Sequence, residues 1–169
     1  MHPVILIIGA SGGLGASTLA AVTATVLARD SSPTLVDGDF GAGGLDATLA
    51  VEHLEGLRWP DLTEHEGDVD ALGLRRDLPE GPVPVLAARG GRPSVGTVRA
   101  VTRGLAGVGP VVIDAPSGPS VPRVWVEEAD VLVVLVGLRP RWLRDGEALA
   151  AVLADASDRT VLVTRGPRR

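Results

Sequence analysis

The sequence predicts an α/β fold with a mostly parallel sheet flanked by helices. Short apolar runs rich in β-branched residues alternate with longer amphipathic stretches along the 169 residues. The runs lack polar alternation, which is typical of strands covered by helices on both faces. The length suits one domain, so we expect residues 1–169 to form a single one.

The expected elements follow one another in a regular order. A strand over Val4 to Ile8 leads through glycines into a helix over Ala16 to Arg29. Five further strands are expected at Thr34 to Val36, Val83 to Ala87, Val111 to Ile113, Val131 to Val136 and Thr160 to Val163. Further helices are expected near Ser94 to Leu105, Pro122 to Glu128 and Arg141 to Ala154. The acidic stretch Val51 to Glu80 contains prolines, which predicts short helices and loops on the surface.

The composition excludes several classes of chemistry. There is no cysteine, so disulfides, thiolate metal sites and a cysteine nucleophile are ruled out. All 16 basic residues are Arg, and the chain has no Lys, Tyr, Asn or Gln. A net charge of −5 argues against a nucleic-acid binder. No apolar run reaches the ~18 residues of a membrane span, so we expect a cytoplasmic protein.

A glycine-rich loop follows the first strand and opens the first helix. It reads Gly9-Ala10-Ser11-Gly12-Gly13-Leu14-Gly15-Ala16-Ser17-Thr18. Glycines let backbone N–H groups close around phosphate oxygens, and the helix N-terminus adds partial positive charge. The loop therefore predicts a phosphate-binding site, although a tight strand-to-helix turn alone would also use glycine.

The loop by itself fits two chemistries. Gly9 to Gly15 resembles the dinucleotide loop of short-chain dehydrogenases, which would bind NAD(P). Those enzymes depend on a catalytic Tyr and Lys, usually supported by Asn, and this chain contains none of the three. Ser11 to Ser17 also resembles the deviant phosphate loop of the MinD/ParA family of P-loop ATPases, with both of its lysines replaced, by Ser11 and Ala16.

Carboxylates after two later strands favour the second resemblance. Asp37 and Asp39 follow one strand and lead to Leu45-Asp46, and Asp114 follows another. The resemblance to MinD/ParA ATPases implies that Asp39 orients the attacking water. It implies that Ser17, Asp37 and Asp114 hold Mg²⁺, partly through water, which suits the preference of Mg²⁺ for few carboxylates.

The same resemblance implies a P-loop NTPase fold of the SIMIBI/MinD-like type and ATP or ADP with Mg²⁺ as cofactor. The nucleotide would be held by Gly12, Gly13, Leu14, Gly15, Ala16, Ser17 and Thr18, with Thr164 and Arg165 at the edge that meets the adenine. A homodimer is a further family expectation. ParA-like DNA partitioning is a further alternative, and an acidic chain without Lys argues against it.

Motifs in the middle of the chain resemble one branch of this family, the CpaE-like, septum-site-determining (Ssd-type) proteins. They are Gly56 to Leu62, Val69-Asp70, Leu78-Pro79, Val85-Leu86 and Arg89-Gly90. The resemblance implies protein partners in secretion, Tad pilus or division machinery, which would recruit the protein to the membrane or pole.

The missing lysines predict a degenerate ATPase. Without cations on the phosphates, transition-state stabilisation falls by several kcal/mol, so we expect weak ATP binding or binding without efficient hydrolysis. The alternative is a slow ATPase that uses an arginine from another segment, with Arg89, Arg92, Arg139 and Arg165 as candidates.

Three other features each fit more than one interpretation. The cluster Arg139 to Arg144 fits a solvated helix start, or a contact with nucleic acid, acidic lipid or a partner. Trp59 fits either an interface anchor or a pin for the acidic segment. His53 and His65, beside four glutamates, fit a surface loop better than a metal site.

The family usually continues beyond Gly166 to Arg169, so we expect a C-terminally short version with no evident membrane anchor.

Overall fold

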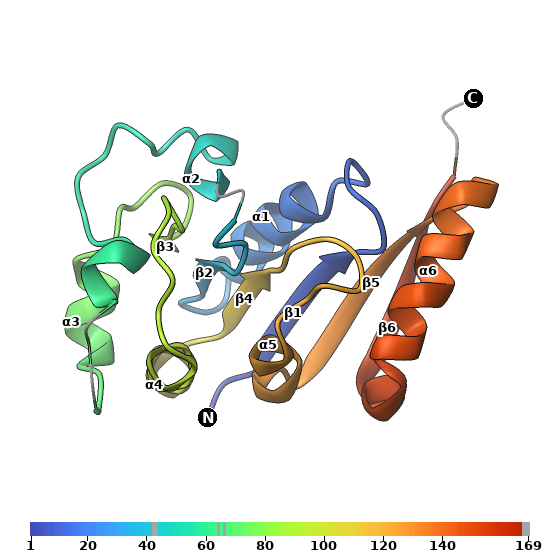
Figure 1. Cartoon of the computed structure of the whole chain (residues 1–169). Coiled ribbons are helices and arrows are strands. Elements are labelled where there is room, and N and C mark those ends of the chain that lie inside the picture. The colour runs from blue at the N-terminus through green and yellow to red at the C-terminus, as the bar shows by residue number, and fades with distance from the viewer. Residues whose placement is uncertain (42–43, 64, 66, 167–169) are drawn as a thin grey trace.

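A computed structural model describes residues 1–41, 44–63, 65 and 67–166. Six parallel strands form one sheet (Figure 1). They are β1 (Val4–Gly9), β2 (Thr34–Asp37), β3 (Val85–Leu86), β4 (Val111–Asp114), β5 (Val131–Gly137) and β6 (Thr160–Arg165). The main helices are α1 (Ala16–Leu27), α4 (Val95–Val108), α5 (Arg123–Glu128) and α6 (Pro140–Val152). The predicted fold class is therefore confirmed.

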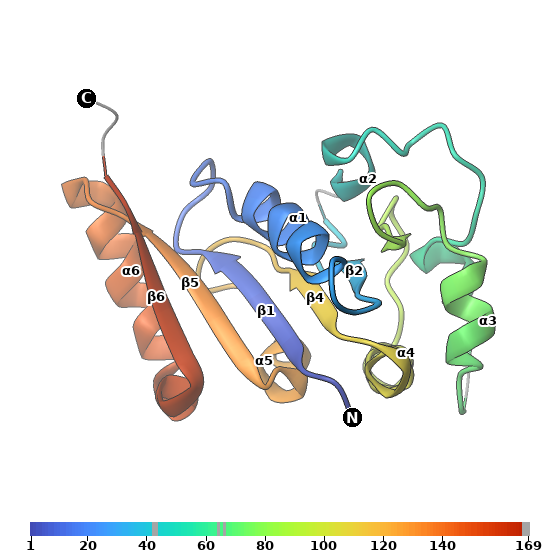
Figure 2. The same ribbon diagram turned by 180° about the vertical axis from the view of Figure 1, so that it is seen from behind.

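The helices cover the sheet on both faces. In Figure 1, α4, α5 and α6 lie in front of the sheet, and Figure 2 shows α1 on the opposite face, over β1 and β4. The small residues Ala16, Ala20 and Ala24 turn inward from α1, which lets its backbone approach the strands. The strands β1 to β4 are almost entirely buried between these layers, which explains their unbroken apolar runs.

The strand order is β3-β2-β4-β1-β5-β6. In the dinucleotide-binding fold the first two strands are neighbours, in the order 3-2-1-4-5-6. Here β4 lies between β1 and β2, and it pairs with both in parallel. This order does not favour the dehydrogenase alternative.

The third strand is shorter than predicted. The sequence predicts a strand over Val83 to Ala87, but only Val85 and Leu86 pair with β2. Pro84 has no backbone N–H to donate, and it forms an isolated antiparallel bridge with Glu80. The strand ladder therefore cannot extend toward the N-terminus.

The acidic segment forms short elements beside the β3 edge, as the sequence predicts. They are the 3₁₀ helix η1 (Trp59–Leu62) and α3 (Ala71–Arg76), and α3 packs against α4. The short helix α2 (Leu45–Thr48) precedes this segment. Trp59 is fully buried, so it pins this segment to the sheet and is not an exposed interface anchor. A second 3₁₀ helix, η2 (Ala154–Arg159), connects α6 to β6.

The strand β6 is an edge of the sheet. On the α1 face, no helix of the described residues covers β6 (Figure 2), and Val161 is 51% exposed. Leu162 on the other face is 68% exposed. These side chains continue the apolar character of β5 without its burial.

Two glycines at the end of α4 give the first prediction. A Cβ on Gly109 would overlap the carbonyl oxygen of Ser32, whereas Gly107 is exposed in the helix with open space around it. We expect Gly109→Ala to lower the free energy of unfolding by about 1–3 kcal/mol through overpacking. Gly107→Ala, the matched control, is expected to raise it by about 0.5–1 kcal/mol through helix propensity. Urea unfolding of both variants tests the pair, and equal effects would contradict this packing.

Candidate functional site

The loop between β1 and α1 has the backbone of a phosphate cradle. Gly13 and Gly15 adopt positive φ angles of 74° and 92°, a conformation that side chains rarely tolerate. A Cβ on Gly13 would meet nothing within 4 Å, so its backbone faces open space. Gly15 caps α1, a helix of 12 residues whose free N–H groups and dipole favour an anion.

The loop is tied to the rest of the sheet edge at several points. The amide of Ala10 donates to the carbonyl of Leu135 at 2.8 Å, and the amide of Gly118 donates to the carbonyl of Gly9 at 2.8 Å. The hydroxyl of Ser11 donates to the carboxylate of Asp145 on α6. These contacts hold the loop in one conformation between β5, α6 and the segment after β4.

A pocket of about 250 Å³ opens beside the loop. Three carboxylates line it, from Asp37, Asp39 and Asp114, together with the hydroxyl of Ser17. Asp37 and Asp114 are direct neighbours across the β2–β4 pairing, at the carboxyl ends of both strands. Ligands of open α/β sheets bind at this edge.

The carboxylate of Asp37 organises the chain around it. It accepts hydrogen bonds from the amides of Asp39 at 3.1 Å, Leu45 at 3.3 Å and Ala88 at 3.3 Å. Burial nevertheless raises the pKa of Asp37 to about 6, because desolvation outweighs these hydrogen bonds. The side chain therefore fixes the loop after β2 and remains an ionisable group of the pocket.

The carboxylate of Asp114 is the less satisfied of the pair. The hydroxyl of Ser17 hydrogen-bonds to it, but its buried Oδ1 has no hydrogen-bond partner among the described residues. Burial raises the pKa of Asp114 to about 6, and the charges of Asp37 and Asp39 raise it further. A buried oxygen of this kind, next to a hydroxyl, fits the water shell of a Mg²⁺ ion.

The protein groups alone do not form a closed metal site. Among residues 1–41, 44–63, 65 and 67–166, no group of three His, Asp or Glu side chains lies close enough to hold a metal ion. Mg²⁺ commonly uses one or two carboxylates, several waters and substrate phosphates. The arrangement therefore fits a Mg²⁺ ion that arrives with a phosphate ligand.

The structure gathers most of the predicted site residues around this one pocket. Those on its lining are Gly13, Leu14, Gly15, Ala16, Ser17, Thr18, Asp37, Asp39 and Asp114. Gly12 is exposed in the same loop, and Thr164 and Arg165 lie outside the lining. Sequence reasoning missed Gly44, Leu45, Thr48, Ala115 and Ser117, although Leu45 and Ser117 belong to motifs that follow the strands.

The two lysine positions of the MinD/ParA pattern lack a cation in the structure as in the sequence. Ala16 is buried at the start of α1 and lines the pocket, and Ser11 is engaged by Asp145. Of the four candidate arginines, Arg165 reaches the loop, where its guanidinium donates to the carbonyl of Leu14. Arg89 instead pairs with Asp46 and with the carbonyl of Glu52.

The other two candidates have different surroundings. The guanidinium of Arg139 lies over the ring of Trp142, 4.9 Å from its centroid. Arg92 lines a separate groove of about 600 Å³, which shares Asp39 with the pocket. Asp39 therefore stands between the pocket and this groove.

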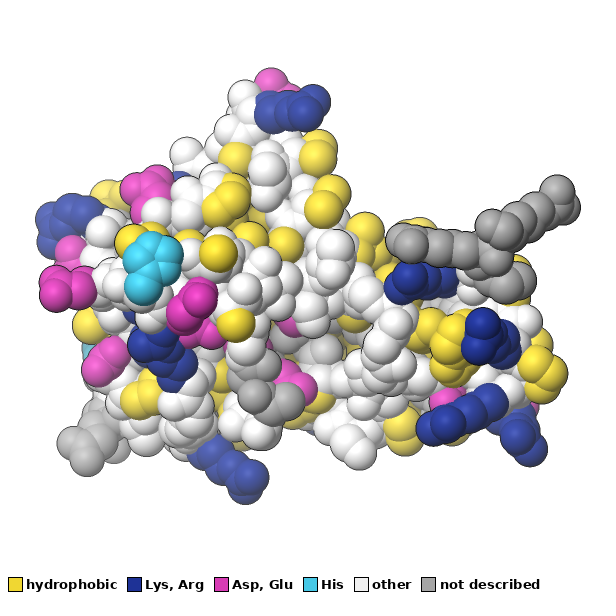
Figure 3. Space-filling model, turned by 90° about the horizontal axis from the view of Figure 1, so that it is seen from above, with side chains coloured by type: hydrophobic (Ala, Val, Ile, Leu, Met, Phe, Trp, Pro, Cys, Tyr) yellow, Lys and Arg dark blue, Asp and Glu magenta, His cyan; other side chains and the backbone are white. Residues whose placement is uncertain are grey.

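The cluster Arg139 to Arg144 forms the start of α6, as expected for a helix start. Figure 3 shows arginine side chains gathered at the α6 end of the molecule, with hydrophobic side chains among them. Leu138 and Leu143 are nearly half exposed there.

The metal site considered for the acidic segment includes Glu64 and Glu66, which lie outside the described residues, as do residues 167–169.

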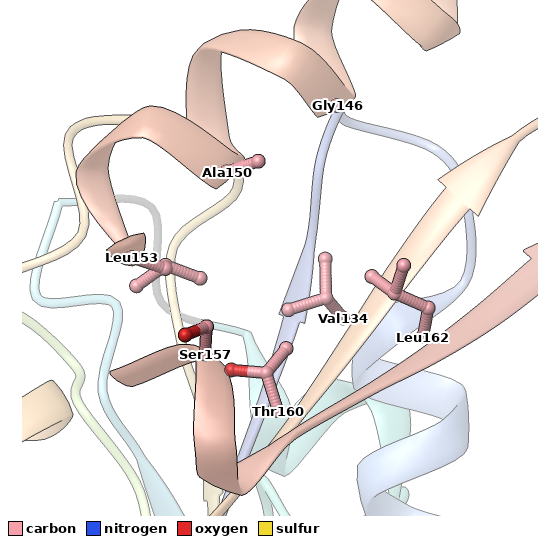
Figure 4. A pocket seen from close by; sticks show the side chains of 7 residues that line it. All are labelled: Val134, Gly146, Ala150, Leu153, Ser157, Thr160 and Leu162. Atoms are coloured by element: carbon pink, nitrogen blue, oxygen red, sulfur yellow. The ribbon is translucent and has the colours of Figure 1, made fainter. Parts of the chain in front are cut away.

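A second cavity, of about 210 Å³, lies between α6 and the strands β5 and β6. Figure 4 shows its lining, which is apolar apart from the hydroxyls of Ser157 and Thr160. It lies on the helix-covered face, away from the carboxylates, and its lining carries no charged group. We assign no chemistry to it.

Solved structures decide the identity of the fold. A ParA family ATPase from Chlorobium tepidum superposes with a TM-score of 0.76 at 17% identity, over 98% of this chain and 74% of that one. MinD from Aquifex aeolicus, in a MinC:MinD complex, gives 0.75 at 20% identity, over 96% and 68%. The chain has the ParA/MinD fold. MinD from Pyrococcus horikoshii, complexed with Mg-ADP, gives 0.60 at 18% identity, over 96% and 68%.

Curated proteins give a closer match in sequence. The uncharacterized proteins Rv3660c and MT3760, from two strains of Mycobacterium tuberculosis, are each 34% identical over 169 residues. The alignment covers 97% of this chain but 47% of each relative, so the chain spans about half their length. No family model matches the chain.

In the described part of the chain, none of the helices has the length and apolarity needed to cross a bilayer.

The buried carboxylates predict an unusual pH dependence of stability. Because the pKa of Asp114 is about 6 in the folded state and near 3.8 otherwise, the folded state holds the proton more tightly. Stability from this group is therefore present below pH 4 and is lost as the pH rises to 6. We expect Asp114→Asn to raise the free energy of unfolding by about 1–3 kcal/mol at pH 7.5, and by much less at pH 4.

Thermal and urea unfolding without Mg²⁺ or nucleotide measures this difference. Asp158→Asn, at an exposed position, is the matched control and should change little at either pH. Destabilisation by Asp114→Asn at pH 7.5 would show that the ionised carboxylate stabilises the fold, contrary to this account.

Proposed function

We propose that this chain is a MinD/ParA-type nucleotide-binding protein with a degenerate phosphate loop. It binds ATP or ADP with Mg²⁺ and hydrolyses ATP slowly or not at all. One observation carries the proposal: a glycine loop, a helix N-terminus and two buried carboxylates meet at one pocket of the ParA/MinD fold. The P. horikoshii MinD with this fold is complexed with Mg-ADP, which supports the choice of ligand.

The roles of the residues follow from their chemistry. Backbone amides from Gly12 to Thr18 bind phosphate oxygens, since the loop offers open amides at a helix N-terminus. Ser17 and Asp114 hold the Mg²⁺ shell together with Asp37, partly through water. Asp39 orients a water molecule if hydrolysis occurs, and Thr164 with Arg165 forms the edge toward the base.

The missing lysines set the limit on catalysis. Phosphoryl transfer depends on positioning and on stabilising charge at the phosphates. Among the residues that the structure describes, the pocket lining holds three carboxylates and no side-chain cation, so Mg²⁺ and the amides must balance the phosphate charge. A slow ATPase is the second candidate, and it is favoured by one observation: the Arg165 guanidinium already contacts the loop at Leu14.

We infer a positioning or scaffold role rather than efficient catalysis. The motifs from Gly56 to Gly90 resemble CpaE-like, septum-site-determining proteins, which implies partners in secretion, pilus or division machinery. MinD in the A. aeolicus structure is bound to MinC, so this fold can hold a protein partner. Homodimerisation, and recruitment from the cytoplasm to the membrane or pole, belong to the same proposal.

Restoring the loop lysine gives the decisive test. Ala16 lines the pocket, so a lysine there would extend toward the phosphates. We expect Ala16→Lys to raise the rate of Mg-ATP hydrolysis at least tenfold, because one cation at the transition state contributes more than 1.4 kcal/mol. Val22→Lys, half exposed on the same helix, is the control with equal charge and should leave the rate unchanged.

The hydrolysis rate of the unmodified protein is the second measurement. Robust Mg²⁺-dependent hydrolysis that is lost in Asp39→Ala would contradict a degenerate ATPase. No gain from Ala16→Lys, in a variant that still folds and binds Mg-ATP, would show that the loop charge does not limit the reaction.

A further inference from the structure

Aromatic residues are rare in this chain and are concentrated beside the candidate site. The chain has three Trp, one Phe and no Tyr. Phe40, Trp59 and Trp125 form one cluster, with ring centroids 5.4 Å, 5.9 Å and 6.2 Å apart. Both indole rings are fully buried, from segments 66 positions apart (125 minus 59) in the sequence. The placement of this cluster is therefore a specific feature of the fold.

The two indoles hold the carboxylate loop by its backbone. The Nε1–H of Trp59 donates to the carbonyl of Asp37 at 2.8 Å. The Nε1–H of Trp125 donates to the next carbonyl, that of Gly38, at 3.1 Å. Both hydrogen bonds are buried, where an acceptor left without a donor is unfavourable because water cannot replace the donor. The start of the loop after β2 is thus held from two sides.

The packing around Gly38 leaves this backbone no room to move. A Cβ there would lie 2.9 Å from Nε1 of Trp125 and 3.0 Å from the carbonyl oxygen of Asp114. The amide of Gly38 donates to that same carbonyl at 2.8 Å. The backbones of the two carboxylate residues and one indole are therefore in direct contact, so displacing the ring displaces the carboxylates.

Trp59 belongs to a segment that is rigid in its own right. Arg58, next to it, is buried, and its guanidinium donates to the carbonyls of Gly56 at 2.8 Å and Leu54 at 3.0 Å. The amide of Trp59 donates to the carbonyl of Ala87 at 3.1 Å. The next residue, Ala88, donates its amide to the carboxylate of Asp37. Segment 51–62 therefore reaches Asp37 by two routes, the indole and the Ala88 amide.

We propose that Trp59 and Trp125 are positioning residues for Asp37 and Asp39 of the nucleotide site, and that Trp59 couples the surface segment 51–62 to this site. Phe40 is the third member, since it follows Asp39 directly and its ring contacts both indoles. Coupling of this kind is reciprocal: nucleotide at the pocket stabilises the docked segment, and a docked segment favours nucleotide. This inference rests on the proposed nucleotide site.

The first test measures nucleotide affinity in variants that keep an aromatic ring but lose the indole N–H donor. We expect Trp59→Phe and Trp125→Phe each to weaken Mg-ADP binding 3- to 10-fold in calorimetric titrations. Leu105→Val is the control, because it removes buried volume near the C-terminal end of α4, far from the site. Affinity losses that match those of the control at equal loss of thermal stability would assign the tryptophans a purely structural role and overturn the proposal.

The second test needs no nucleotide and separates this proposal from the proposed function. We expect the amides of Leu45 and Ala88, which donate to Asp37, to exchange hydrogen at least fivefold faster in Trp59→Phe than in the unmodified protein. Leu105→Val should leave both unchanged. If the unmodified protein binds no Mg-ADP, the proposed function fails, while faster exchange still supports the positioning role. Unchanged exchange in Trp59→Phe would overturn it.

Discussion

The strand β4 lies between β1 and β2, and the candidate site depends on that position. It places the end of β4 next to the end of β2, so that Asp37 and Asp114 are cross-strand neighbours. It also places both beside the glycine loop that follows β1, to which Ser17 belongs. In the dinucleotide-binding fold β1 and β2 are adjacent, so no strand between them could place a carboxylate next to both β2 and the loop.

Electrostatics then decides what this pocket can hold. Two carboxylates are buried side by side with raised pKa values, and the part of the pocket lining that the structure describes offers no side-chain cation in return. A nucleotide would add further negative charge, so the loop amides and the dipole of α1 need a divalent cation as partner. Mg²⁺ is therefore expected to be a condition for binding, and not only for hydrolysis. Under the proposed function, the glycine loop accounts for nucleotide binding, and the replacement of both lysines accounts for slow hydrolysis or none.

Much of the fold and the site could be predicted from sequence, because those features are local. Apolar runs mark the strands, and glycines followed by small residues mark the loop and α1. The places of Asp37 and Asp114 at the ends of β2 and β4 follow from the apolar runs that these aspartates terminate. The shortened β3 could have been anticipated at Pro84, but the bridge to Glu80 could not.

The features that the sequence could not give depend on contacts between distant segments. The bonds of Trp59 and Trp125 to successive carbonyls join three separate parts of the chain. The Ser11–Asp145 bond and the contact of Arg165 with Leu14 span more than 130 positions each. No local pattern distinguishes Arg165 from Arg89, which instead pairs with Asp46. Only the packing of the folded chain determines which of these arginines contacts the loop.

Calorimetric titration of the unmodified protein with ADP tests the central claim most directly, once with Mg²⁺ and once with EDTA, and with NADP as comparison. We expect saturable binding of Mg-ADP, at least tenfold weaker binding of ADP in EDTA, and no binding of NADP. Binding that is indifferent to EDTA, binding of NADP, or no binding of Mg-ADP would contradict the central claim. The last result would leave the glycine loop as a structural turn.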